Sequence, residues 1–177
     1  MILPVKKSGF TLIELLLVIT IISIITVGVI PEFSTYIRNQ NLKQGQEQIK
    51  SDLRSTQNKA LTGSLTDQLI GGFPMKFWGM KFTNESASYD YFISVTDATC
   101  PSNYIDGQYQ GKGKLNNNLK IQNFTSGASG CLFFSVDNGG ITSPGFGSDV
   151  SVIVGYSATE VKNIFFNSAG LIYSTNE

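Results

Sequence analysis

The chain has 177 residues, of which 41% are apolar and 15% are charged, and its formal net charge is zero. The length fits one globular domain plus an appendage, and the zero net charge gives no global attraction to nucleic acid or to an acidic partner. The sequence contains no histidine, which excludes Ser-His-Asp and Cys-His catalysis, and its two cysteines are too few for a structural zinc site.

The first long feature is an apolar stretch from Phe10 to Pro31, whose only charged residue is Glu14. As a helix this stretch is about 33 Å long, which is enough to cross the hydrocarbon core of a bilayer. Lys6 and Lys7 precede it, so the positive-inside tendency predicts a cytoplasmic N-terminus and an exported remainder. A secretory signal peptide would have a shorter apolar region and a small-residue cleavage site after it, and no such site follows here. A plain membrane anchor remains the alternative.

Neither a signal peptide nor a plain anchor explains Glu14. A carboxylate inside an apolar span is costly, and an ionisable residue in such a place indicates a functional role with a specific partner. Glu14 lies close to the start of the stretch, so its carboxylate can partly reach the membrane interface.

The residues around this acid resemble the N-terminal segment of type IV prepilins and type II secretion pseudopilins. They read Lys6-Lys7-Ser8-Gly9-Phe10-Thr11-Leu12-Ile13-Glu14-Leu15. The resemblance implies that a prepilin peptidase cuts after Gly9 and methylates the new N-terminal residue, Phe10. It also identifies Glu14, fifth when counted from Phe10, with the family's acid, and Pro31, twenty-second, with the family's helix-breaking proline.

Cleavage before Phe10 would leave the apolar segment intact and remove Lys6 and Lys7. The new terminal amine is a cation at the start of the helix. Glu14 of the same chain, or of a neighbouring subunit in a fibre, can neutralise that amine and offset part of the desolvation cost. We therefore predict that Phe10 and Glu14 act in assembly and that Glu14 sets the axial register.

Gly28 and Pro31 predict a bend in the helix, because proline removes a backbone hydrogen bond and disturbs the preceding turn. A helix end at the membrane border is the alternative. The helical pattern resumes after Pro31, which favours a continuous but kinked helix.

Residues 32–62 are polar with apolar positions at helical spacing, and they predict an amphipathic spine helix. The apolar positions are Phe33, Ile37, Ile49, Leu53 and Ala60. We expect this stripe to be the seam that packs on the sheet that follows. Gly45 is expected to weaken the helix by about 1 kcal/mol relative to alanine.

From Gly63 onward the sequence is rich in glycine, asparagine, aromatic and β-branched residues, which predicts short strands separated by turns. The expected strands are Lys76–Phe82, Tyr89–Thr96, Leu119–Phe124, Leu132–Val136, Val150–Tyr156, Asn163–Asn167 and Leu171–Tyr173. The expected fold class is α+β, with a long N-terminal transmembrane and spine helix packed on a small antiparallel sheet or two-sheet head, as in the pilin fold.

Cys100 and Cys131 both fall in the part predicted to be exported, where two such cysteines are expected to pair. Closing a loop of about 30 residues stabilises a fold by roughly 3–4 kcal/mol in the chain-entropy model. A redox-active pair is the alternative, but the C-x-x-C spacing typical of one is absent.

Shorter segments are similar to the minor pseudopilin H and FimT-like group within this family. They are Leu53 to Ala60, Trp78 to Phe82, and Ile164 to Ile172. The resemblance implies a minor subunit, associated with the tip of a filament, with two small sheets packed on the helix.

DNA is one candidate ligand, and its binding would require clustered basic residues. The lysines after residue 63 are Lys76, Lys81, Lys112, Lys114, Lys120 and Lys162. Lys112 and Lys114 with Tyr104 and Tyr109 form the best patch, although a solvated loop explains the same residues. A minor pilin whose head binds DNA or an adhesion ligand is therefore kept as the alternative function.

Calcium is the second candidate ligand, because it is bound by oxygen atoms. Oxygen atoms are available at Asp137, Asn138, Gly139 and Asp149. The spacing of an EF-hand is absent, and a turn built from these residues explains them equally well. We expect no metal, no cofactor and no catalytic residues.

The sequence predicts four parts: a leader peptide at 1–9, a transmembrane and assembly helix at 10–31, the spine helix at 32–62 and the β-rich head at 63–177. The predicted function is that of a structural subunit, not an enzyme, of a type IV pilus-like or type II secretion filament. Its expected partners are the prepilin peptidase, other pilin or pseudopilin subunits and the bacterial inner membrane. The chain would cross that membrane once, with a cytoplasmic N-terminus and a periplasmic or extracellular head, before it joins the filament.

Overall fold

The computed structural model describes residues 9–125, 129–144 and 149–174, without the side chains of residues 28–31 and of Asp149. Residues 1–8 of the predicted leader lie outside this description. The chain divides into two compact units, 1–40 and 41–177, and the long helix α1 (Leu12–Leu61) contributes to both. Each unit is considered by itself.

The helix ends in a glycine cap. Gly63 adopts a left-handed φ of 64°, its backbone N–H donates to the Ala60 carbonyl at 3.0 Å, and the Ser64 N–H donates to the Lys59 carbonyl at 3.0 Å. This is the hydrogen-bond pattern of a Schellman motif, and it satisfies carbonyls that a helix end leaves without partners. The observed end at Leu61 agrees with the predicted spine helix to within one residue.

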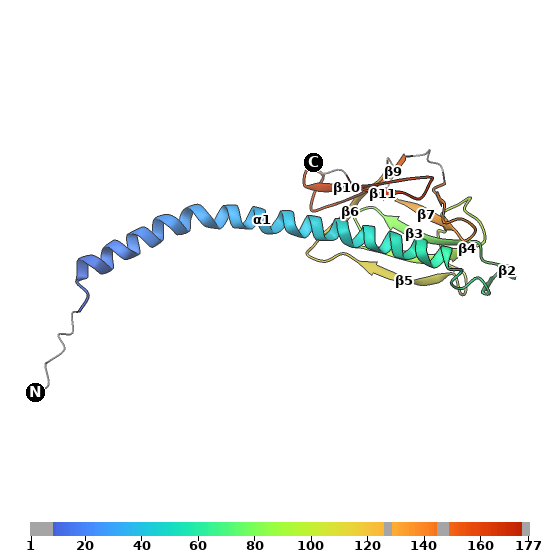
Figure 1. The fold of residues 1–177 in the computed structure, drawn as a ribbon, viewed down its shortest axis with the longest axis horizontal. Coiled ribbons are helices and arrows are strands. Elements are labelled where there is room, and N and C mark those ends of the chain that lie inside the picture. The colour runs from blue at the N-terminus through green and yellow to red at the C-terminus, as the bar shows by residue number, and fades with distance from the viewer. Residues whose placement is uncertain (1–8, 126–128, 145–148, 175–177) are drawn as a thin grey trace, which may run out of the picture. The chain divides into compact units, whose positions relative to one another are not determined.

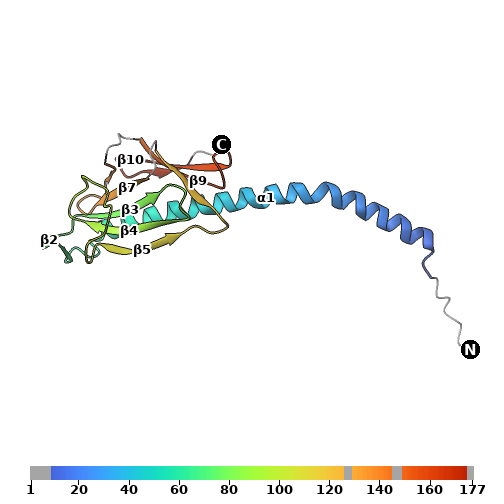
Figure 2. The same cartoon turned by 180° about the vertical axis from the view of Figure 1, so that it is seen from behind.

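The head contains antiparallel strands in two main sheets and one short hairpin (Figures 1 and 2). The five-stranded sheet has the order β5 (Tyr109–Lys114), β4 (Ser88–Ser94), β3 (Phe77–Thr83), β7 (Ser129–Ser135) and β8 (Ile141–Thr142). The four-stranded sheet has the order β11 (Ile172–Tyr173), β10 (Val161–Asn167), β9 (Asp149–Gly155) and β6 (Lys120–Phe124). The hairpin consists of β1 (Leu69–Ile70) and β2 (Phe73–Pro74).

This architecture confirms the predicted α+β class and each of the seven expected strands, with small shifts at their ends. Four further strands, β1, β2, β5 and β8, were not predicted. Three of these have only two residues, whereas β5 forms a full edge of the five-stranded sheet.

The head half of α1 packs one face on the sheets. Leu42, Ile49, Leu53 and Ala60 are buried there, in the same apolar cluster as the inward-facing residues of both sheets. The predicted seam is therefore correct for Ile49, Leu53 and Ala60. It is wrong for Phe33 and Ile37, which are 62% and 42% exposed, because the part of α1 that contributes to the buried cluster begins only at Leu42.

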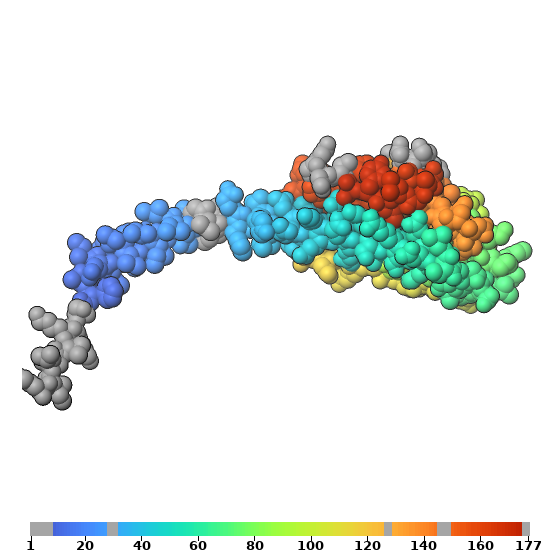
Figure 3. All heavy atoms as spheres, viewed as in Figure 1, coloured from blue at the N-terminus to red at the C-terminus, as the bar shows by residue number. Residues whose placement is uncertain are grey.

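Glutamine side chains attach the helix to the sheets. The Nε2 of Gln46 donates to the Asn163 carbonyl of β10, and that of Gln48 to the Lys114 carbonyl of β5, each at 2.8 Å. Gln57 donates to carbonyls in two turns of the head. In Figure 3 the outer surface of this helix segment lies between the C-terminal strands, in red, and β5, in yellow. These amides hold both sheets to one helix.

Gly45 has a packing role that its helix propensity does not indicate. A Cβ at this position would lie 2.6 Å from Cδ1 of Leu119, which is itself buried. The missing side chain lets the segment before β6 approach the helix closely. The glycine therefore combines a weak helix propensity with a close helix–loop contact.

Two strand glycines face aromatic residues directly across the five-stranded sheet. Gly79 of β3 pairs with Phe92 of β4, and Gly113 of β5 pairs with Tyr89 of β4. A Cβ on Gly79 would lie 2.3 Å from Cζ of Phe92, and a Cβ on Gly113 would lie 2.1 Å from Cε2 of Tyr89. In both pairs the ring occupies the space above the glycine, which is how aromatic residues compensate for glycine in a sheet.

Candidate processing and assembly segment

The predicted cleavage position lies just before the start of α1. Gly9 and Phe10 are exposed and have no helix or strand assignment, and the Phe10 side chain is 87% exposed. A Cβ added to Gly9 would meet no atom within 4 Å. The fold therefore does not itself require glycine at this position, and a requirement for it would have to come from the enzyme that reads the segment.

The first turn of α1 is closed by a capping box formed by Thr11 and Glu14. Oε2 of Glu14 accepts a hydrogen bond from the Thr11 N–H at 2.9 Å and another from the Thr11 hydroxyl at 3.0 Å. The Glu14 N–H in turn donates to the Thr11 hydroxyl at 3.3 Å. This reciprocal pattern satisfies backbone donors at the helix start.

Thr11 is a residue of this segment that was not predicted from the sequence, whereas Glu14 was. The T-x-x-E spacing before an apolar run is a known signature of a capping box and could have identified this residue. Both hydrogen bonds to the carboxylate use the same oxygen, Oε2. The capping box therefore uses one of the two carboxylate oxygens of Glu14. The pairing of this acid with a terminal amine stays a prediction.

The part of α1 that follows is apolar and exposed along its length. Every residue from Leu12 to Val27 is exposed, and among the described residues α1 is the one helix long and apolar enough to cross a membrane, by length and composition. Three hydroxyls interrupt the apolar side chains, and each donates to a carbonyl one turn earlier: Thr20 to Leu17, Ser23 to Ile19 and Thr26 to Ile22. These internal hydrogen bonds make the hydroxyls compatible with a surrounding of hydrocarbon.

Gly28 and Pro31 lie inside α1, which continues through both positions. A helix end at the membrane border is therefore wrong for this structure, and the continuous helix is correct. No geometry of a bend is described at Gly28 or Pro31, so the kink stays a prediction.

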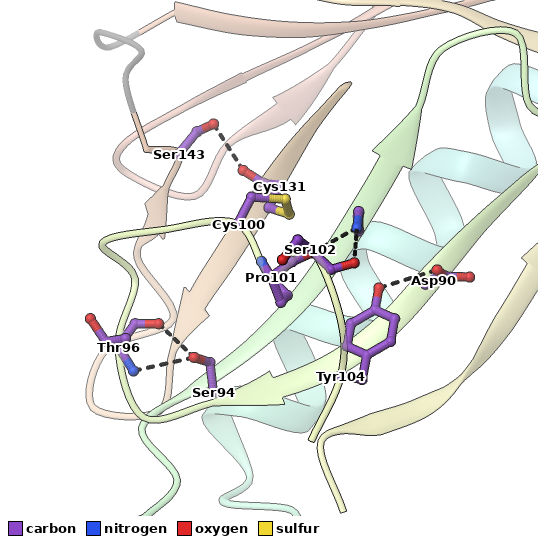
Figure 4. The surroundings of a disulfide bond; sticks show 10 residues. Asp90, Ser94, Thr96, Cys100, Pro101, Ser102, Tyr104, Cys131 and Ser143 are labelled. Carbon is purple, nitrogen blue, oxygen red and sulfur yellow. Dashed lines mark hydrogen bonds between the residues drawn. A yellow bond between two sulfur atoms is a disulfide. The ribbon is translucent and has the colours of Figure 1, made fainter. Parts of the chain in front are cut away.

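In the head, Cys100 and Cys131 form a disulfide, with their Cα atoms 5.5 Å apart. Cys131 lies on β7, and Cys100 lies in the connection between β4 and β5. The side chain of Cys131 is buried, and its carbonyl accepts a hydrogen bond from the Ser143 hydroxyl at 2.8 Å (Figure 4).

The predicted basic patch is partly neutralised by an acid. Nζ of Lys112 lies 3.7 Å from the carboxylate of Asp90, and the Tyr104 hydroxyl donates to the same carboxylate at 3.1 Å. The rings of Tyr104 and Tyr109 are 5.4 Å apart. Lys114 lies on the same edge strand. The structure thus brings Lys112 and Tyr104 to Asp90, with Tyr109 beside Tyr104, and this acid weakens the case for phosphate binding.

A second polar cluster lies between the helix and the inner face of the five-stranded sheet. The Tyr89 hydroxyl donates to the carboxylate of Asp52 on α1. Burial, followed by this hydrogen bond, raises the pKa of Tyr89, and burial together with the Asp52 charge raises the pKa of Tyr91. Because the hydrogen bond joins β4 to α1, the cluster is a clamp between helix and sheet.

The residues weighed for calcium form a turn. Oδ1 of Asn138 accepts a hydrogen bond from the Gly140 N–H at 2.8 Å, and Gly139 adopts a left-handed φ of 66°. The side chain of Asp149 lies outside the described residues. Within the described part of the chain, no group of three or more acidic or cysteine side chains is placed to hold a metal ion.

Comparison with known proteins adds one match. Residues 5–30 match the family model described as the prokaryotic N-terminal methylation motif. No curated protein and no solved structure matches the chain. The matched segment contains Gly9, Phe10 and Glu14, and it supports the resemblance to the type IV pilin family that the sequence indicated.

Proposed function

We propose that the chain is a structural subunit of a type IV pilus-like or type II secretion filament. The observation that carries this proposal is the match of residues 5–30 to the N-terminal methylation motif. The exposed apolar helix after the motif supports membrane anchoring and assembly with other pilin-type subunits. Pilin-type subunits are structural proteins, which supports a structural rather than an enzymatic role.

The proposed processing is cleavage after Gly9 and methylation of the Phe10 amine by a prepilin peptidase. The exposure of both residues ahead of α1 supports access by such an enzyme. The proposed leader is 1–9, followed by the transmembrane and assembly helix at 10–31, the spine helix at 32–62 and the head at 63–177.

The proposed location is the bacterial inner membrane, with a single crossing, a cytoplasmic N-terminus and a periplasmic or extracellular head. Lys6 and Lys7 ahead of the apolar segment support this orientation. The disulfide between Cys100 and Cys131 supports an oxidising compartment for the head.

The proposed subgroup is the minor pseudopilin H and FimT-like group. Two antiparallel sheets packed on one helix, as that group is expected to have, support this assignment. Quantifying the subunit in sheared filaments tests it: a minor subunit is far less abundant than the major pilin, whereas a comparable amount would contradict the assignment.

The experiment that tests the function is the intact mass of the full chain, produced with and without a prepilin peptidase. We expect the peptidase to remove residues 1–9 and to add one methyl group to Phe10. A chain that keeps its full mass beside an active peptidase would be a plain membrane anchor, and the proposal would be wrong.

A matched pair of variants makes the result specific. Gly9→Val should remain uncut, and since the structure leaves free space around Gly9, this loss cannot be attributed to a clash within the chain. Thr11→Ser keeps the hydroxyl of the capping box and should be cut normally. Equal cleavage of both variants would contradict recognition of this motif.

A further inference from the structure

The five-stranded sheet has buried aromatic residues on both faces. Its inner face belongs to the main core with α1. On its outer face, a separate cluster is formed by Phe92, Phe133 and Cys131, with Phe77, Tyr104 and Cys100 packed against it. The Phe92 ring lies 5.4 Å from Phe133 and 5.9 Å from Tyr104. An outer face of this kind would be exposed if nothing covered it.

The cover is the segment 95–108 between β4 and β5, which we name the strap. Cys100 and Tyr104 belong to it, and Figure 4 shows both on the chain segment that passes over the sheet, with Tyr104 directed toward Asp90. The remaining strap side chains are largely exposed. The strap therefore covers the aromatic cluster with few apolar contacts of its own.

The other attachments of the strap are mostly polar. At its C-terminal end the Gln108 carbonyl accepts a hydrogen bond from the Ile93 N–H at 2.9 Å, and Nε2 of Gln68 donates to the Gly107 carbonyl at 3.1 Å. Nζ of Lys81 donates to the Pro101 carbonyl at 2.6 Å and lies 5.6 Å from the centre of the Tyr104 ring. The Thr142 hydroxyl donates to Asp97 at 2.9 Å. Exposed polar contacts of this type contribute little net stability, because water replaces them readily.

The disulfide is the covalent attachment of the strap to the sheet, since it joins Cys100 in the strap to Cys131 in β7. Cys100 and Tyr104 pack on the outer cluster, whereas Val95, at the start of the strap, packs on the main core. Regions that are joined to a fold by few contacts can open by themselves while the rest stays folded. The strap has the features of such a region once its covalent attachment is removed.

We propose that the Cys100–Cys131 disulfide is a redox-sensitive lock on the strap. Reduction opens residues 95–108 and uncovers the Phe77, Phe92 and Phe133 surface, while the main core and its helix remain folded. The head then presents two different outer surfaces, one with the disulfide formed and one without it. An oxidising compartment closes the strap, and a dithiol reductant opens it.

The reduction is a two-electron thiol–disulfide exchange with a dithiol. A thiolate of the dithiol attacks the sulfur of Cys100, which is more exposed than that of the buried Cys131, and the electron pair of the broken S–S bond passes to Cys131. The second thiol of the reductant then displaces the Cys100 sulfur. The products are two cysteine thiols, which take up two protons, and the oxidised, cyclic disulfide of the dithiol.

Hydrogen–deuterium exchange of the full chain in detergent micelles, with and without dithiothreitol, tests the proposal. We expect exchange in peptides covering 95–108 to rise by roughly a hundredfold to a thousandfold on reduction, the range expected when a loop of this length loses its crosslink. Peptides covering 49–60 of α1 should not change. Unchanged exchange in the strap would show that its other contacts hold it, and faster exchange in the helix would show that the disulfide supports the whole head.

Two variants separate the lock from the weaker contacts. The double variant Cys100→Ser and Cys131→Ser should show the open strap without any reductant. Lys81→Met removes the lysine contacts but keeps the disulfide, so its strap should remain closed until dithiothreitol is added. An open strap in oxidised Lys81→Met would assign the lock to Lys81 and overturn the proposal.

Discussion

Replacing Gly79 by alanine tests whether the glycine–aromatic pair organises the five-stranded sheet. The added methyl would lie 2.3–2.7 Å from three atoms of the Phe92 ring, well inside contact distance. The ring has little room to move, because it is fully buried and contacts both Phe133 and Tyr104. We therefore expect Gly79→Ala to destabilise the head.

The size of the effect follows from two opposing contributions. Alanine is better than glycine in a strand by roughly 0.5–1 kcal/mol, since glycine loses more conformational freedom on folding. Extra volume in a well-packed core costs about 1–3 kcal/mol. The expected net loss is about 1–2 kcal/mol in the free energy of unfolding.

The assay is urea unfolding of the full chain in detergent micelles with the disulfide intact. Trp78 is the only tryptophan in the sequence, is buried, and precedes Gly79 in β3, so its fluorescence reports on this part of the sheet. Phe92→Ala is expected to cost about 3–5 kcal/mol. The double variant should lower the free energy of unfolding by about 1–3 kcal/mol less than the sum of the two single changes, because the overpacking cost is absent when the alanine methyl no longer meets a ring. If the losses in free energy of unfolding caused by Gly79→Ala and Phe92→Ala simply added up, the methyl would not meet the Phe92 ring, and the predicted steric conflict would be refuted.

Three further predictions concern the helix. Tyr89→Phe should lower the free energy of unfolding by about 1–3 kcal/mol, because Asp52 loses the hydrogen bond of a buried partner. Urea unfolding measures this loss. Burial raises the pKa of Tyr89 in the folded head. The free energy of unfolding of the wild type should therefore decrease as the pH rises above about 10, the pKa of tyrosine in the unfolded chain, and that of Tyr89→Phe should decrease less steeply. Gly45→Ala should give no net stabilisation in the same assay despite the better helix propensity, since its methyl meets a buried leucine; clear stabilisation would contradict this. Glu14→Gln keeps a capping acceptor but loses the charge, whereas Thr11→Ala loses the capping hydroxyl. If charge governs assembly, only Glu14→Gln should be depleted from sheared filaments; the reverse result would assign Glu14 to capping.

Most of the head could be predicted from the sequence because its inner strands alternate aromatic and β-branched residues. The edge strand β5 could not, since Tyr109–Lys114 contains two glycines and two lysines and has no apolar alternation. Its strand conformation depends on pairing with β4, where Asp90 lies opposite Lys112 and Tyr89 opposite Gly113. Lysines and glycines also suit an edge, where they discourage pairing with another chain.

The N-terminal segment shows a different limit. Its position-by-position pattern predicts roles for Gly9, Phe10 and Glu14, and the T-x-x-E signature of a capping box, which was not used, would have identified Thr11. The cysteine pairing followed from the expected compartment alone. The role of the disulfide in attaching the strap could not be predicted from the sequence, because the strap and the outer aromatic cluster are defined by contacts between distant parts of the chain.

The two units use apolar residues in opposite ways, and this determines how the chain can be handled. The head buries its large apolar side chains in its own core, whereas more than ten of them between residues 10 and 27 are exposed. Burial of one such side chain is worth about 1.5–3 kcal/mol, so the segment as a whole gains roughly 20–40 kcal/mol from an apolar surrounding. This exceeds the total stability of a typical domain, about 5–15 kcal/mol. The surroundings of α1, rather than the fold of the head, therefore decide where the chain resides. A filament that takes such a chain out of a bilayer must bury the same side chains, so the transfer itself changes the free energy little. Specific contacts, such as the proposed pairing of Glu14 with a terminal amine, can then set its direction.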